Sequence, residues 1–283
     1  MNTVAAAPKT SVATRFREAL TLKRVAIGFA VAALGLAAVY TPPTFALFVV
    51  VITVIATLEF GNLAKRSGVE ISLPIAVVGS GLYPVLAYFH LLSHYEPWLI
   101  TAIVMASFVA ALPADLHHFA GRVAMTVLAT LYLGKMLSYL VLLRGAHDGL
   151  AFTYWLIVIV ALTDIVGMIA GLGFGQHPLA PRLSPAKTWE GAIIALAVAT
   201  VLGSAMWFAW HVRGPLWVAF VLPLCVSIAA EFGDLIESAF KRNAQVKDSG
   251  HLLAGHGGVL DRFDSYIFAG VTGYIVLGFA GLL

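Results

Sequence analysis

Apolar residues occur along this chain in long runs that short polar connections separate. A helix that crosses the hydrocarbon core of a bilayer needs about 20 apolar residues, whereas a strand of a membrane β-barrel shows about ten residues of alternating polarity. Runs of this length predict an all-α, polytopic membrane protein with about nine transmembrane helices. The expected spans are 25–40, 44–62, 71–92, 98–112, 123–143, 150–172, 190–210, 215–237 and 265–283.

The polar segment 1–24 precedes the first apolar run and is rich in Lys and Arg. No small-residue cleavage site follows the run 25–40, which favours a retained span over a signal peptide. Pro42 and Pro43 end that span, because proline cannot continue the helical hydrogen-bond ladder. We therefore expect a basic N-terminal tail, 1–24, and a single membrane-embedded domain, 25–283.

Composition excludes an ordinary soluble domain. The chain is 60% hydrophobic and 11% charged, with a mean hydropathy of +0.93, whereas soluble domains carry about 25% charged residues. The single cysteine, Cys225, allows neither an intrachain disulfide nor a thiolate metal site. A net charge of +3 in a membrane protein reflects topology more than a polyanionic partner, so no nucleic-acid partner is expected.

The distribution of the 17 Lys and Arg residues predicts the orientation of the spans, because cytoplasmic loops carry most cations. With nine spans and a cytoplasmic N-terminus, only Arg144 and Arg213 fall outside, and Lys135 lies within a span. Loss of one span would invert every later loop and divide the cations more evenly. The two longest polar connections, 173–189 and 238–264, are thus expected to face the cytoplasm.

Acidic residues gather near the last two spans. Six of the 14 Asp and Glu residues fall between 231 and 264. Glu231 and Asp234 are three residues apart near the end of a span, and Ser238 follows on the same helical face. A carboxylate at that depth is costly unless it faces a wet cavity or a cation. This pattern predicts a polar cavity open to the cytoplasm.

The segment 238–264 mixes cations, carboxylates, glycines and histidines. Cations neutralise phosphate oxygens, and glycines allow backbone N–H groups to approach them. Carboxylate oxygens suit Mg²⁺, which binds through one or two carboxylates and substrate phosphates. The segment is therefore a candidate polyphosphate site.

The same segment resembles the signature of the phosphatidate cytidylyltransferase (CDP-diglyceride synthetase) family, S-x-x-K-R-x4-K-D-x-G-x2-L-P-x-H-G-G-x-x-D-R-x-D. Ala254 stands where that pattern has proline. G-D-L-I-E-S at 233–238 and S-P-A-K-T-W-E-G at 184–191 are similar to two further family segments. The matching signature positions are Ser238, Lys241, Arg242, Lys247, Asp248, Gly250, Leu253, His256, Gly257, Gly258, Asp261, Arg262 and Asp264.

Upstream, Asp164 with Gly167 and the Phe174–Gly175 pair resembles another family segment, and Glu59 resembles the family's acidic residue near the end of an early span. Either acid could line the cavity or pair with a buried cation. Lys135 could reach the membrane surface, pair with an acid or face the cavity.

The resemblance implies transfer of the cytidylyl group of CTP to phosphatidic acid, which gives CDP-diacylglycerol and pyrophosphate. It implies Mg²⁺ at Asp234 and Asp261 and leaves a second cation open. Lys187, Lys247, Asp248, His256 and Arg262 are the implied catalytic residues. The implied substrate contacts are Ser184, Ser238, Lys241, Arg242, Gly257, Gly258 and Asp264.

Plainer interpretations exist for these residues, since cations in cytoplasmic loops can serve topology alone and Asp can cap a helix. Among other functions, a CDP-alcohol phosphatidyltransferase would need D-G-x2-A-R-x8-G-x3-D-x3-D, which is missing here. A transporter with an ion-binding acidic cluster and a non-catalytic relative are the remaining alternatives. We expect a multi-pass protein of the bacterial inner membrane, and the sequence leaves a homo-oligomer open.

Overall fold

The computed structural model describes residues 33–113, 115–212, 214–250, 252 and 257–283. The predicted tail, 1–24, and the first half of the first predicted span, 25–32, lie outside this part. Within it, residues 33–39 are helical. The further helices are α3 (Pro42–Arg66), α4 (Leu73–Tyr88), α5 (Leu92–Ala111), α6 (Leu116–Ala129), the π-helix η1 (Thr130–Lys135), α7 (Met136–Gly145), α8 (Gly149–Phe174), α9 (Trp189–Ala209), α10 (Leu216–Asn243) and α11 (Leu260–Phe279).

The expected all-α membrane fold is confirmed. Each predicted span from the second to the ninth corresponds to a helix or, for 123–143, to the continuous helical segment α6–η1–α7. In the described part of the chain, five helical segments are long and apolar enough to cross a membrane: α3, Leu116–Gly145, α8, α9 and α10. α4 is apolar but shorter. The total of nine spans remains a prediction.

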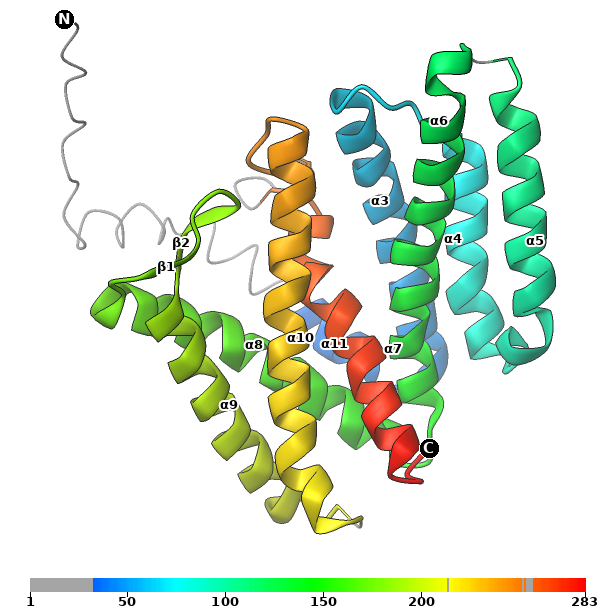
Figure 1. The fold of residues 1–283 in the computed structure, drawn as a ribbon. Coiled ribbons are helices and arrows are strands. Elements are labelled where there is room, and N and C mark those ends of the chain that lie inside the picture. The colour runs from blue at the N-terminus through cyan, green and yellow to red at the C-terminus, as the bar shows by residue number, and fades with distance from the viewer. Residues whose placement is uncertain (1–32, 114, 213, 251, 253–256) are drawn as a thin grey trace, which may run out of the picture.

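The helices form two groups with α10 and α11 between them (Figure 1). α8 packs against α9 on one side, α3 packs against α4 on the other, and α10 packs along α11. The connections that follow α3, α5 and α10 lie toward one end of the molecule, and those that follow α4, α7 and α9 lie toward the opposite end (Figure 1). This alternation agrees with the order of spans that the hydropathy pattern predicts.

The polar connection between α8 and α9, 173–189 in the sequence prediction, contains a β-hairpin, which the hydropathy pattern did not predict. β1 (Pro178–Ala180) pairs antiparallel with β2 (Ser184–Thr188), with Pro178 opposite Thr188. Thr188 then caps α9, because its side chain accepts a hydrogen bond from the Gly191 N–H at 3.2 Å. The hairpin thus leads directly into α9.

Glu190 in the first turn of α9 holds the start of this hairpin. Its carboxylate accepts hydrogen bonds from the backbone N–H groups of Gln176 and His177 at 3.1 and 3.2 Å. The Nδ1 atom of His177 lies 2.5 Å from Oε1 of Glu190. Both ends of the connection are therefore attached to α9.

Lys135, which the sequence places within a span, pairs with an acid. Its Nζ lies 2.5 Å from Oε1 of Glu96 on α5. The pair joins α5 to the π-helical turn η1. Next to it, Gly134 packs against the backbone of Ser80 on α4, where an added Cβ would lie 2.5 Å from the Ser80 Cα.

Arg144 is a buried side chain at the end of α7, only 9% exposed. Its Nε donates to the carbonyl oxygen of Val39 at 2.6 Å, and Nη2 donates to that of Tyr40 at 2.8 Å. The last carbonyls of a helix have no partner within it and attract positive charge. Arg144 therefore holds the end of the helix at 33–39 against α7.

We expect Arg144→Met to lower the free energy of unfolding by roughly 1–3 kcal/mol, because it leaves the buried carbonyl oxygen of Val39 without this donor. Thermal melting of the purified protein in detergent measures this change. Arg66→Met is the matched control, since Arg66 is exposed at the end of α3. Equal melting temperatures for the two variants would contradict this account of Arg144.

Candidate active site

A cavity of about 490 Å³ lies where α8, α10, the start of α11 and the β-hairpin meet. Its wall mixes acids, cations and apolar side chains. The lining residues are Asp164, Gly167, Met168 and Leu172 of α8; Leu179, Ser184, Ala186, Lys187 and Thr188 of the hairpin; Ala192 of α9; Glu231, Asp234, Ser238, Lys241 and Arg242 of α10; Lys247 and Asp248; and Asp261, Arg262, Asp264 and Ser265 of α11.

Most of the site residues predicted from the sequence come together here. Ser184, Lys187, Asp234, Ser238, Lys241, Arg242, Lys247, Asp248, Asp261, Arg262 and Asp264 all line the cavity. Gly257 and Gly258 are described but are not among its lining residues. His256 lies outside the described residues, as do His251 and Ala254.

Lys187 joins the hairpin to α10. Its Nζ lies 2.6 Å from Oε2 of Glu231 and 2.7 Å from Oδ2 of Asp234. The two acids are one helical turn apart, so one ammonium group reaches both. Burial lowers the pKa of Lys187, but the carboxylates of Asp234 and Glu231 outweigh this effect and raise the pKa above its usual value. Lys187 is therefore a fixed positive charge.

Lys241 makes a second junction, between α10 and α11. It forms ion pairs with Glu237 and with Oδ1 of Asp261, the latter at 2.7 Å. Oδ2 of Asp261 accepts hydrogen bonds from the backbone N–H groups of Ser249 and Gly258 at 2.9 and 2.7 Å, and from the Ser249 hydroxyl at 2.9 Å. Asp261 thereby holds the turn that precedes α11.

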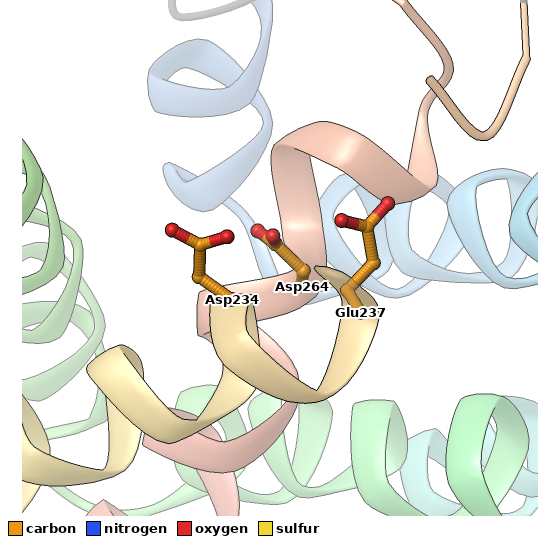
Figure 2. Close-up of side chains that lie close together, drawn as sticks. All are labelled: Asp234, Glu237 and Asp264. Carbon is orange, nitrogen blue, oxygen red and sulfur yellow. The ribbon is translucent and has the colours of Figure 1, made fainter. Parts of the chain in front are cut away.

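Three carboxylates from the two helices lie side by side (Figure 2). Oxygen atoms of Asp234, Glu237 and Asp264 all lie within 4.8 Å of one another. Figure 2 shows Asp264 of α11 between the two acids of α10, with all three carboxylates on the same side. Like charges this close repel one another, and a cation between them removes that repulsion.

The cluster fits a metal ion by its chemistry. Glu237 is fully buried, and within the described part of the chain its Oε1 accepts no hydrogen bond. An oxygen without a donor at a group of carboxylates is the type of ligand that a hard divalent cation binds. Sequence reasoning did not assign Glu237 to the site, although its position three residues after Asp234 places both acids on one face of α10.

Arg242 has a structural attachment in addition to its place in the cavity wall. Its Nε donates to the carbonyl oxygen of Leu183 at 3.1 Å, and its Nη1 donates to that of Val246 at 3.1 Å. The first bond attaches the hairpin to the end of α10, and the second holds the segment that follows α10. Of the two acids expected at the cavity wall, Asp164 lines it. Glu59 instead binds backbone N–H groups at the start of α11.

Comparison with known proteins identifies the family of the chain. The model of the cytidylyltransferase family matches residues 22–280. A phosphatidate cytidylyltransferase of Staphylococcus aureus is 31% identical over 230 residues, which cover 78% of this chain and 85% of the relative. A phosphatidate cytidylyltransferase of Helicobacter pylori is 38% identical over 182 residues, which cover 64% of each chain.

A phosphatidate cytidylyltransferase of Bacillus subtilis is 36% identical over 148 residues, which cover 52% of this chain. The match spans about half of that relative's length, 55%. The family model covers both the signature segment and the apolar first half of the chain. Together with the match to most of the S. aureus protein, it confirms the resemblance inferred from the motifs: the chain belongs to the cytidylyltransferase family.

Proposed function

We propose that this protein transfers the cytidylyl group of CTP to phosphatidic acid. A phosphate oxygen of phosphatidic acid attacks the α-phosphorus of CTP, the bond from that phosphorus to the β-phosphate oxygen breaks, and pyrophosphate leaves. The observation that carries the proposal is the cavity itself, which gathers the signature residues at the ends of apolar helices. Family membership supports the same reaction.

CTP and phosphatidic acid are both anions and repel each other, and the cationic side chains of the cavity offset this repulsion. Lys187, Lys241, Arg242, Lys247 and Arg262 line the cavity. Phosphoryl transfer needs mostly positioning and charge stabilisation, since the nucleophile is already ionised. Arg262 can bind two phosphate oxygens through its planar fork, and Lys187 and Lys247 can stabilise the departing pyrophosphate.

Asp234 and Asp261 would hold Mg²⁺ in this reaction, and Glu237 and Asp264 would supply oxygens beside Asp234 for a second cation. When bound, Mg²⁺ would offset the charge of the CTP phosphates and assist the departure of pyrophosphate. Ser238 donates to Oδ1 of Asp234 at 3.4 Å and so helps to orient this carboxylate.

The lipid would enter sideways from the membrane, with its acyl chains remaining in hydrocarbon. α8 supports this route, because Met168 and Leu172 line the cavity and are also 56% and 41% exposed. The charge distribution supports a cavity that faces the cytoplasm, and the membrane we propose is the bacterial inner membrane. CTP and phosphatidic acid would then meet at the inner leaflet.

The direct test supplies the purified protein with labelled CTP, phosphatidic acid and Mg²⁺. We expect the label to move into the organic phase with release of one pyrophosphate per product. Diacylglycerol is the matched control substrate, because it lacks the phosphate nucleophile and should give no labelled lipid. Label that stays aqueous without pyrophosphate release would favour a transporter or a non-catalytic relative.

A second prediction concerns the carboxylates. Asp234→Asn and Asp261→Asn should each lower turnover at least about 100-fold, as expected when a main electrostatic stabiliser is lost. In the wild type, Mg²⁺ at about 100 times its dissociation constant should stabilise the fold by about 2.7 kcal/mol, and Asp234→Asn should reduce this. Asp148→Asn, at an exposed acid before α8, is the control. Full activity in either site variant would contradict its assignment as a metal ligand.

A third prediction concerns Lys187. Lys187→Gln should lower kcat/KM about 100-fold, and the loss should stay constant between about pH 7 and 9, because the raised pKa keeps Lys187 protonated over that range. The exposed Lys65 supplies the control Lys65→Gln. A defect that disappears as the pH rises through this range would show that Lys187 loses its proton there.

A further inference from the structure

Glu59 lies on α3, in a part of the chain far from the signature segment, and only 6% of it is exposed. Its Oε1 accepts a hydrogen bond from the backbone N–H of Val259 at 3.0 Å. Its Oε2 accepts one from the N–H of Leu260 at 2.8 Å and lies 3.2 Å from the Ser249 hydroxyl. A single buried carboxylate thus binds two backbone N–H groups at the start of α11 and contacts the hydroxyl of Ser249.

The start of α11 needs such a partner. The first N–H groups of a helix have no acceptor within it, and the N-terminal end attracts negative charge. Val259 occupies the capping position and provides no side-chain hydrogen bond. Glu59 supplies the missing acceptor from another helix, through charge-assisted hydrogen bonds that are stronger than neutral ones.

Two glycines of the signature leave room for the carboxylate of Glu59, because they have no side chain. A Cβ added at Gly250 would meet Glu59 before any other residue, and one added at Gly258 would collide with the hydroxyl of Ser249 and with Glu59. The sequence suggested that glycines here let backbone approach phosphate. At position 250 the neighbour that excludes a larger residue is Glu59, and at position 258 it is Ser249 together with Glu59.

Ser249 connects Glu59 to the cavity. Its hydroxyl oxygen lies 3.2 Å from Oε2 of Glu59 and 2.9 Å from Oδ2 of Asp261, and its backbone N–H donates to the same Asp261 oxygen. Asp261 lies in the first turn of α11, and Asp264 follows one turn later. The place of both acids therefore depends on how the start of α11 is held.

We propose that Glu59 is a positioning residue: by binding Ser249, Val259 and Leu260 to α3, it sets the orientation of Asp261 at the cavity. Glu59 does not line the cavity, so its effect on the reaction passes through Asp261 and Ser249. The catalytic part of this inference rests on the proposed function. The structural part, a clamp between α3 and the start of α11, does not.

The first test is Glu59→Gln, which keeps the size of the side chain but replaces one acceptor oxygen with an amide nitrogen. We expect kcat to fall about 10- to 100-fold, the range seen for residues that orient metal ligands, while KM for CTP changes less than about threefold. Hydrogen exchange of the amides of Val259 and Leu260 should become faster. Glu70→Gln is the matched control, because Glu70 is an exposed acid shortly after α3.

The hydrogen-exchange measurement distinguishes the structural part of the proposal from its catalytic part. Faster exchange in a protein that makes no CDP-diacylglycerol would support the clamp and refute the proposed reaction. Unchanged exchange and unchanged kcat in Glu59→Gln would overturn the clamp. A rise in KM alone, with kcat intact, would also overturn the positioning role and indicate a substrate contact.

A double-mutant cycle tests whether contact with Glu59 is the reason that position 250 requires glycine. Gly250 has no positive φ, so alanine is compatible with its backbone and the obstacle is Glu59 itself. We expect Gly250→Ala to lower kcat in the wild type but to add little in a Glu59→Ala background. If the double variant shows the product of the two single-variant losses in kcat, Gly250 and Glu59 act independently, and this result would refute the shared contact.

Discussion

Two lysines bind four carboxylates where the helices end, and the shape of the cavity depends on these ion pairs. Lys187 brings the hairpin against Glu231 and Asp234, and Lys241 brings Asp261 of α11 against Glu237 of α10. Buried carboxylates are costly unless cations and hydrogen-bond donors surround them. Each lysine therefore makes the burial of two acids tolerable and at the same time connects two elements at the cavity wall. The ion pairs of Lys187 attach the hairpin to α10, and those of Lys241 add a polar link between α10 and α11, which also pack along each other.

A related constraint applies to the backbone at helix ends, which water cannot satisfy inside a packed membrane protein. Glu59 binds N–H groups at the start of α11, and Arg144 binds carbonyls at the end of the helix at 33–39. The signs of the two side chains are those that the helix dipole favours. In both cases the partner comes from a distant part of the chain, so the bond that completes one helix also determines which helix lies beside it.

These contacts show which parts of the structure the sequence could predict. Run length predicted the helices because it reflects the thickness of the bilayer, and the motif predicted most of the cavity wall. Hydropathy does not identify partners, so Lys135 could be placed in a span but not paired with Glu96. Glu59 lies about 200 residues from the backbone groups that it binds, and no local pattern relates them. The hairpin was missed because its strands, of three and five residues, are too short to give a pattern of their own.

Asp234 belongs to two groups at once, and this has a consequence for the proposed reaction. It pairs with Lys187 through Oδ2, and it is also one of the three acids that lie within 4.8 Å of one another. A cation bound at these acids would neutralise charge that otherwise holds the ammonium group of Lys187. The positive charge of Lys187 would then act more strongly on an anion in the cavity, because fewer carboxylate charges oppose it. The acids and cations that stabilise the cavity in the absence of substrate are in this way the groups that prepare it for two negatively charged reactants.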